Sequence, residues 1–269
     1  MLAYPNIDPV ALSIGPLQIH WYGLMYLLAF GTAWGLATYR IKKPGSSWTA
    51  EQVSDLLFYC AMGIILGGRA GYVLFYNFGQ FLQDPIWLFR VWEGGMSFHG
   101  GLIGVVLALA YFGHKYKKNI FEVGDFMAPF VPIGLMFGRF GNFIGGELWG
   151  RVSDVSWAMV FPRAGDLPRH PSQLYQAFGE GFLLFVVLWI YSSRPRPQKA
   201  VSAMFLLGYG ICRTAAEFFR EPDAQIGFDL FGWLTRGQLL SIPMIFVGLA
   251  LLVYAYRSRP APSAKLFRE

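Results

Sequence analysis

Apolar stretches long enough to cross a membrane recur along the whole chain of 269 residues. A helix of about 20 residues spans the hydrocarbon core of a bilayer, which is roughly 30 Å thick. Short polar breaks separate seven such stretches, which cover residues 20–39, 54–76, 96–113, 123–144, 173–191, 201–218 and 238–256. We therefore predict an all-α polytopic membrane protein with seven transmembrane helices, organised as a single domain over residues 1–269.

The composition favours the same class of protein. Charged residues make up 14% of the chain, whereas about 25% is usual in soluble domains. The hydrophobic fraction of 55% excludes a disordered chain, because disordered chains have low hydrophobicity. A disulfide scaffold is also excluded, since the chain has only two cysteines, Cys60 and Cys212, and both lie inside apolar stretches.

The placement of the charges decides what the net charge of +6 means. The breaks after the first, third, fifth and seventh stretches carry 13 Lys and Arg residues, including all seven lysines. The other breaks carry six arginines and no lysine. Because basic loops are retained in the cytoplasm, we expect the N-terminus outside and the C-terminus inside. The pattern therefore indicates membrane topology and no nucleic-acid partner.

Three external segments follow from this topology, namely residues 77–95, 145–172 and 219–237. A segment as long as 145–172 is usually either functional or disordered, and its aromatic residues and prolines favour an ordered structure. The internal segments are short and basic, which leaves little room for a catalytic domain. We therefore expect the chemistry on the outer side of the membrane.

Three arginines, Arg69, Arg139 and Arg213, lie inside predicted spans. Each costs at least about 2.5–3.5 kcal/mol at a helix centre and so needs a partner or a polar cavity. The topology places all three in the outer half of the membrane. For Arg213 the partner could be Glu217, one helical turn away. For Arg69 and Arg139 either backbone carbonyls or a bound phosphate or carboxylate would serve, and we favour the bound anion.

His99 lies between two pairs of glycines in the segment 94–101, at the outer start of the third predicted span. The glycines would expose its imidazole, which can exchange a proton near neutral pH. A structural role is the alternative. The four histidines are scattered without the spacing of metal ligands, so we expect no metal, and we also expect no cofactor. No serine lies in the sequence setting of a catalytic nucleophile, so acyl transfer through a serine is not expected.

The segment Gly138–Gly150, with the sequence GRFGNFIGGELWG, resembles the signature of the bacterial phosphatidylglycerol–prolipoprotein diacylglyceryl transferases. The resemblance continues in residues 20–26, 94–104, 169–175 and 208–223, so it extends over nearly the entire chain. One departure is Gly145, where the signature normally carries asparagine. We expect this glycine to loosen the local hydrogen bonding.

The resemblance implies a reaction and its partners. Members of that family transfer the diacylglyceryl group of phosphatidylglycerol to the lipobox cysteine thiol of a prolipoprotein signal peptide. The reaction forms a thioether, releases glycerol phosphate and is the first step of bacterial lipoprotein maturation. The resemblance also implies a multi-pass protein of the bacterial cytoplasmic (inner) membrane that is surrounded by membrane lipids. Its active site would lie toward the periplasmic side.

The resemblance also suggests roles for particular residues. It supports Arg139 and Arg213 most strongly, as catalytic residues that can hold the lipid phosphate. His99 is a further match and the candidate catalytic base, because a base such as His99 would help to activate the thiol, although local cations could instead lower the pKa of the thiol. Further matches that would bind phosphatidylglycerol are Tyr22, Asn142, Glu147, Gly150, Tyr209 and Glu217. Arg69 joins this set because of its depth in the membrane.

Two other classes of function remain open from the residues. A transporter or channel for an anionic solute would also place arginines inside the membrane, but it would need polar residues through the inner halves of the helices. A structural lipid-binding scaffold would explain the arginines without explaining His99. A transferase assay separates all three, because only an enzyme makes the thioether.

Overall fold

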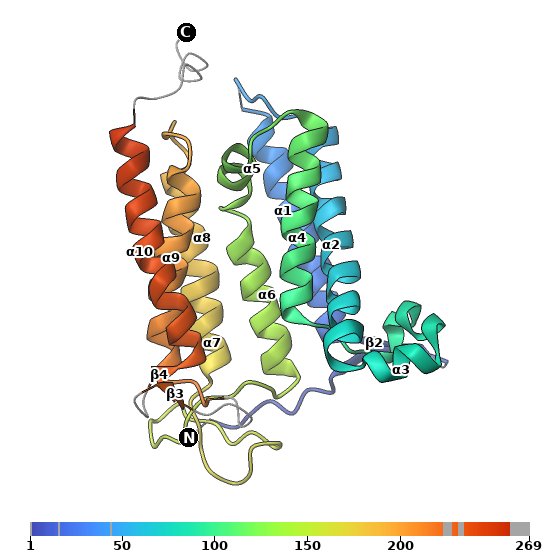
Figure 1. The fold of residues 1–269 in the computed structure, drawn as a ribbon. Helices are drawn as coiled ribbons and strands as arrows, with labels where there is room; N and C mark the ends of the chain where they lie inside the picture. The colour runs from blue at the N-terminus through green and yellow to red at the C-terminus, as the bar shows by residue number, and fades with distance from the viewer. Residues whose placement is uncertain (1, 16, 44, 223–227, 231–233, 259–269) are drawn as a thin grey trace. The chain divides into compact units, whose positions relative to one another are not determined.

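The computed structural model describes residues 2–15, 17–43, 45–222, 228–230 and 234–258, and most of them are helical (Figure 1). The chain forms two compact units. The continuous unit consists of residues 37–123, and the discontinuous unit combines residues 1–36 with residues 124–269. The expectation of a single domain over the whole chain stays a prediction.

The continuous unit is built on two long helices, α2 (Ala50–Tyr76) and α4 (Phe98–Tyr116). Between them lie a short helix, α3 (Phe78–Gln83), and two 3₁₀ turns, η1 (Pro85–Phe89) and η2 (Val91–Glu93). Glycines allow α2 and α4 to pack with their backbones almost in contact. A Cβ atom added at Gly104 would lie 2.0 Å from the carbonyl oxygen of Gly63, so larger residues there would push the helices apart.

The discontinuous unit contains the longest run of helices. Its members are α6 (Val131–Ile144), α7 (Ser172–Gln176), the π-helix η3 (Ala177–Leu183), α8 (Leu184–Tyr191), α9 (Ala200–Glu217) and α10 (Arg236–Arg257). Two further helices, α1 (Trp21–Ile41) and α5 (Ile120–Met127), run across the limits of the units. Helices α9 and α10 lie side by side (Figure 1), because Gly210 and Gly248 let their backbones approach closely.

Two small sheets accompany the helices. Strand β1 (Val10–Ile14) pairs antiparallel with β2 (Leu17–His20), and β3 (Phe228–Leu230) pairs antiparallel with β4 (Leu234–Thr235). The long segment between α6 and α7 is held by backbone hydrogen bonds. Met159 and Arg169 exchange N–H···O bonds of 2.9 Å, and the Arg151 N–H donates to the Phe219 carbonyl at 2.8 Å.

The structure confirms a mostly helical membrane protein. In the described part of the chain, three helical segments are long and apolar enough to cross a membrane: 50–76, 172–191 and 236–257. The pair α5 and α6 meets the same criteria as one broken span, which makes up to four. Large apolar side chains on these segments face outward, such as Ile190 at 65% exposure and Phe246 at 67%. Helices α1, α4 and α9 coincide with the other predicted spans, while the number seven and the orientation stay predictions.

Two predicted spans have irregular backbones. The span predicted as 123–144 is broken after Met127 and bends by 53° between α5 and α6. Pro132 lies in the first turn of α6, where its missing N–H costs nothing but prevents a continuous helix. The span predicted as 173–191 changes to a π-helix over Ala177–Leu183. Such insertions are rare and occur frequently at functional sites.

Candidate functional site

Two of the intramembrane arginines share one buried carboxylate in the discontinuous unit. Arg139 extends from α6, Arg213 from α9 and Glu180 from the π-helix, and the Glu180 side chain is fully buried. Its Oε2 lies 3.4 Å from Nη2 of Arg139, and its Oε1 lies 3.6 Å from Nη1 of Arg213. Close charge-assisted hydrogen bonds are about 2.7–2.9 Å long. Glu180 therefore contacts both guanidinium groups at distances longer than those of close charge-assisted hydrogen bonds.

The local backbone explains how Glu180 reaches the arginines. A π-helix carries one extra residue per turn, which shifts the side chains that follow relative to a regular helix. Gly181, the next residue, packs directly against α6, since a Cβ atom at Gly181 would lie 2.5 Å from Cβ of Met136. This contact is three residues before Arg139. The π-helix and the glycine together bring the Glu180 carboxylate close to α6.

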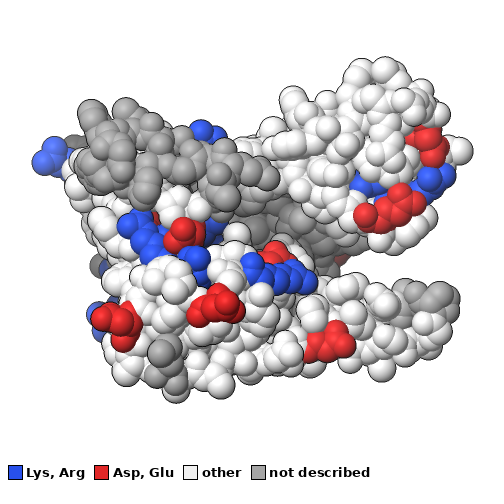
Figure 2. All heavy atoms as spheres, turned by 90° about the horizontal axis from the view of Figure 1, so that it is seen from below, with Lys and Arg blue, Asp and Glu red and all other residues white. Residues whose placement is uncertain are grey.

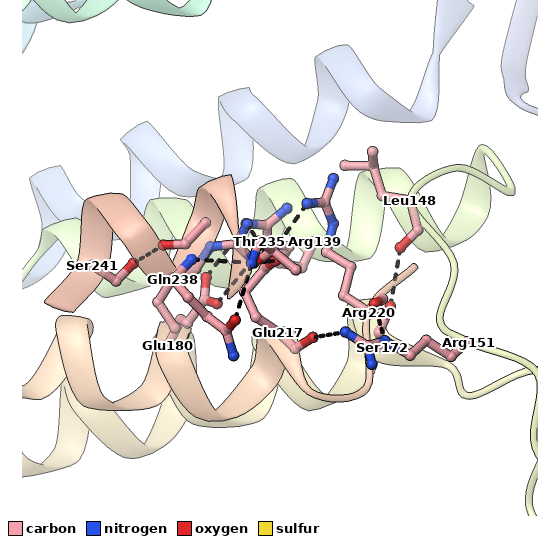
Figure 3. Close-up of polar contacts among 12 residues, drawn as sticks. Arg139, Leu148, Arg151, Ser172, Glu180, Glu217, Arg220, Thr235, Gln238 and Ser241 are labelled. Carbon is pink, nitrogen blue, oxygen red and sulfur yellow. Dashed lines mark hydrogen bonds and ion pairs between the residues drawn. The ribbon is translucent and has the colours of Figure 1, made fainter. Parts of the chain in front are cut away.

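A second carboxylate, Glu217, ends α9 and is 1% exposed. Its Oε1 lies 2.6 Å from Arg213 Nη2 and 3.3 Å from Arg220 Nη1, and its Oε2 accepts a 2.6 Å hydrogen bond from the Thr235 hydroxyl. The carboxylate lies over the first turn of α10, where a Cβ atom at Gly237 would be 2.5 Å from its carboxyl carbon. The N-terminus of a helix attracts a negative charge. We name the group formed by Arg139, Glu180, Arg213, Glu217 and Arg220 the arginine–glutamate cluster. Figure 3 labels all of its members except Arg213.

The outer segment is tied to this cluster. Arg151 donates from Nε to the carbonyl of Arg220 at 3.0 Å and from Nη2 to the carbonyl of Glu217 at 3.2 Å (Figure 3). Gly150 lies where two other backbones converge, and a Cβ atom there would be 2.4 Å from the His170 carbonyl oxygen and 2.6 Å from that of Phe219. Only glycine fits at this position. The predicted site residue Gly150 therefore orders the segment that borders the cluster.

His170 belongs to the same segment and contacts α7. Its Nδ1 lies 3.0 Å from the Tyr175 hydroxyl. Burial lowers the pKa of His170, which favours a neutral imidazole. His170 therefore adds no charge to the border of the cluster near neutral pH.

Four more predicted site residues lie around Arg139 and Arg213. The Tyr22 ring covers Gly141 of α6, and its hydroxyl is within electrostatic range of Glu147 and Arg139. The hydroxyl of Tyr209, on α9, interacts electrostatically with Glu180, Arg139 and Arg213. Asn142 is 8% exposed. Its carbonyl accepts the N–H of Glu147 at 2.9 Å, so these two residues close the turn after α6.

Gly145 lies in that turn. Its backbone is in the right-handed helical region, with φ −70° and ψ −8°, so the position does not require glycine for conformational reasons. A Cβ atom there would lie 3.0 Å from Oε1 of Glu147. The absence of a side chain at Gly145 thus leaves room for the Glu147 carboxylate above the end of α6.

The third intramembrane arginine, Arg69, lies in the continuous unit and is 2% exposed. It donates to the carbonyl oxygens of Trp87 at 2.6 Å, Leu88 at 3.1 Å and Gly95 at 3.3 Å, and also to that of Gly94. Its guanidinium stacks 4.4 Å from the Trp87 ring. Backbone carbonyls thus satisfy Arg69, as in the structural alternative, and its role as a lipid ligand stays a prediction.

His99 also belongs to the continuous unit and is exposed in the first turn of α4. Ser97 caps this helix by accepting the N–H of Gly100 at 3.2 Å, and the imidazole contacts the ring of Phe98. The expected exposure of the imidazole is present in the structure. Its role as a base stays a prediction.

Sequence reasoning missed two members of the cluster. Glu180 was visible as an acidic residue inside a predicted span, but it lies 41 positions from Arg139 and no spacing rule connects them. Arg220 falls in a predicted external segment, yet it is 8% exposed and pairs with Glu217. The position of Glu180 inside a predicted span was the only sequence signal for its role. No sequence signal indicated that Arg220 is buried.

The fold and the cluster define an integral membrane protein with a buried, arginine-rich polar centre. Residues 9–254 match the model of the prolipoprotein diacylglyceryl transferase family. The chain is 63% identical to the phosphatidylglycerol–prolipoprotein diacylglyceryl transferase of Acinetobacter baylyi, and the alignment covers 96% of each chain. Proteins of the same name from Acinetobacter baumannii and Psychrobacter arcticus are 61% and 58% identical, again over 96% of each chain. The chain therefore belongs to the prolipoprotein diacylglyceryl transferase family.

Glu217→Gln should strongly destabilise the protein. The change removes the negative charge that separates Arg213 from Arg220, and breaking a buried ion pair in this way costs about 3–5 kcal/mol. Thermal unfolding in detergent measures the effect. Glu221→Gln is the matched control, because Glu221 is 44% exposed in its pair with Arg169, 3.3 Å away. Figure 2 shows acidic and basic side chains exposed at the surface. An exposed pair contributes about 0–1 kcal/mol. Equal losses of stability in the two variants would contradict the structural account of Glu217.

Proposed function

We propose that this chain transfers the diacylglyceryl group of phosphatidylglycerol to the cysteine thiol of a prolipoprotein lipobox, forming a thioether and releasing glycerol phosphate. Membership of the family and the names of relatives at 58–63% identity support the overall reaction. Both substrates are anchored in lipid, which suits an integral membrane protein. The reaction begins bacterial lipoprotein maturation.

The observation that carries the assignment of the site is the pair of arginines on either side of Glu180. Phosphatidylglycerol is a phosphodiester with one negative charge, and guanidinium groups bind phosphate oxygens through paired hydrogen bonds. Arg139 and Arg213 each contact Glu180 at 3.4 Å or more, and Nη1 of Arg213 has no hydrogen-bond partner among the described residues. We assign these two arginines to the lipid phosphate and Glu180 to their positioning.

The chemical step is a displacement at the glyceryl carbon that carries the phosphate. The thiolate sulfur forms a bond to this carbon while the bond from carbon to the phosphate oxygen breaks. The leaving group is glycerol phosphate, so negative charge grows on the phosphate during the step. Arg139 and Arg213 lower the barrier because preorganised donors stabilise charge where it develops.

His99 is assigned as the base that takes the proton from the thiol. A thiol with a pKa near 8.5 is mostly protonated at neutral pH, and the thiolate is the nucleophile. An imidazole is suited to accept the proton and afterwards to pass it to the leaving phosphate or to water. The exposure of His99 at the start of α4 supports this assignment, because a buried imidazole could not reach a substrate.

The remaining predicted residues are assigned to binding phosphatidylglycerol or shaping its site. The hydroxyls of Tyr22 and Tyr209 can donate to lipid oxygens beside the arginines. Asn142 and Glu147 shape the turn after α6, and Gly150 holds the outer segment in place. Glu217 orients Arg213 through their 2.6 Å contact. Arg69 donates to carbonyls of the segment 87–95 and so holds this segment in place, while its role as a phosphatidylglycerol ligand stays a prediction.

We also infer seven spans in the bacterial inner membrane, with an outer N-terminus and an active site toward the periplasm. The distribution of lysines supports this orientation. In the continuous unit, Lys115 lies 2.6 Å from Asp55, so the end of α4 meets the beginning of α2. In the discontinuous unit, the Asp125 carboxylate accepts the N–H of Lys199 at 2.6 Å. Within each unit, the basic breaks lie at the end away from the outer segment.

A transferase assay with purified protein tests the proposal. Phosphatidylglycerol vesicles and a lipobox peptide should yield a diacylglyceryl thioether on the cysteine, measured by mass spectrometry. In the same assay Arg139→Lys should lose most of the activity while the protein still inserts into the membrane. Lysine retains the charge but not the planar pair of donors that fits a phosphate. The expected loss is on the order of 100-fold, as for other donors that stabilise a transition state.

The alternatives give other results in this assay. An anion transporter or a lipid-binding scaffold would make no thioether with any vesicle. An Arg139→Lys variant with normal turnover would remove the paired phosphate contact from the mechanism.

His99→Gln tests the assignment of the base. Glutamine can hydrogen-bond but cannot take up a proton at neutral pH. We expect the rate of the variant at pH 7 to fall by roughly 10²–10⁴-fold, the usual contribution of general base catalysis. The loss should shrink as the pH rises toward the pKa of the free thiol, since hydroxide then supplies the thiolate. An unchanged rate and pH profile would assign the thiol proton to another group.

A further inference from the structure

Four polar residues along α7 and the π-helix are fully buried, each at 0% exposure: Ser172, Gln173, Gln176 and Glu180. Spacings of three and four residues place the last three on one face of the helix. That face lies in the discontinuous unit, where α7 packs against α6 and α9. A polar stripe is costly in the interior of a membrane protein, so its members need partners.

Three of the four have at least one partner, although Oε1 of Gln173 has none among the described residues. The Ser172 hydroxyl donates to the Leu148 carbonyl at 3.1 Å, and Nε2 of Gln173 donates to the Glu147 carbonyl at 2.6 Å. Glu180 contacts Arg139 and Arg213. Gln176 differs, because neither Oε1 nor Nε2 has a hydrogen-bond partner among the described residues. A buried amide without partners is unfavourable, and such exceptions in native proteins call for an explanation.

The position of Gln176 points to a ligand. It lies three residues after Gln173, which is bonded beside the turn after α6, and four residues before Glu180, which lies between the two arginines. Glu180 Oε1 and Arg213 Nη1 also lack hydrogen-bond partners in the described chain and face each other at 3.6 Å. Gln176 thus lies about one helical turn before Glu180, which contacts both arginines that are assigned to the phosphate.

We propose that the Gln176 carboxamide binds a hydroxyl of the glycerol headgroup of phosphatidylglycerol and so selects this lipid among phosphodiester lipids. A hydroxyl both donates and accepts hydrogen bonds, and the carboxamide has one acceptor oxygen and an NH₂ donor to match it. The amide is uncharged, as is the glycerol. This inference rests on the proposed function, since it extends the assigned phosphate site by one residue.

The proposal predicts opposite effects on stability and on binding. Gln176→Leu replaces an unpartnered amide by an apolar group of similar size, so its melting temperature should stay the same or rise. Gln173→Leu is the matched control, because it changes the same residue type on the same buried face but removes a 2.6 Å hydrogen bond. Its melting temperature should fall. Gln176→Met provides a second variant in case leucine prevents folding.

Lipid binding to the purified full-length protein in detergent is then measured for phosphatidylglycerol and for phosphatidylethanol, which has the same charge but no headgroup hydroxyl. Gln176→Leu should bind phosphatidylglycerol about two- to tenfold more weakly, the loss of one net hydrogen bond. Its affinity for phosphatidylethanol should not change. Equal weakening for both lipids, no weakening for either, or a lower melting temperature with unchanged binding would overturn the proposal.

The readout separates this inference from the function on which it rests. If the wild-type protein forms no thioether, the proposed function fails, whatever the lipid affinities are. If thioether forms but the Gln176 variants bind both lipids as the wild type does, only the role of Gln176 fails.

Discussion

Charges buried in a membrane protein must neutralise one another, and the discontinuous unit is organised around this constraint. Glu180 approaches Arg139 and Arg213 from a different helix than either, and Glu217 joins Arg213 to Arg220. A charge without a partner at this depth would cost several kcal/mol. The pairs thus hold α6, the π-helix and α9 together. In the proposed function the same interaction forms the site, since the contacts of the two arginines with Glu180 are 3.4 Å or longer and leave guanidinium donors for a phosphate.

The backbone is adapted to this cluster at a few positions. The π-helix and Gly181 bring Glu180 toward α6, and Gly237 opens the first turn of α10 to the Glu217 carboxylate. Gly150 allows three backbone segments to meet at the outer border. In each case a side chain would occupy the space of a backbone or a charged group. The geometry of the cluster therefore depends on the absence of a side chain at these glycines.

The sequence predicted the helical segments well, because a run of apolar residues is a local signal that depends only on the lipid environment. It also located Arg139 and Arg213, since a charge inside a span is conspicuous. The partner Glu180 could not be assigned, because its contact with Arg139 depends on how distant helices pack and on a π-helix without a known sequence signal. For Arg69 we favoured a bound anion, but carbonyls of the segment 87–95 surround its side chain. These contacts depend on the fold of the segment 87–95, whose sequence shows no pattern, and the role of Arg69 as a lipid ligand stays a prediction.

The contribution of the headgroup is measured directly as the affinity of the purified protein for two lipids, short-chain phosphatidylglycerol and the corresponding diacylglycerol, which lacks the whole glycerophosphate group. Arg139→Gln removes a charge that faces Glu180 but leaves the apolar surroundings in place. Phosphatidylglycerol should bind this variant at least about tenfold more weakly, as expected when a charge-assisted hydrogen bond is lost, while diacylglycerol should bind as before. Unchanged affinity for phosphatidylglycerol would contradict the claim that the arginine–glutamate cluster holds the lipid phosphate.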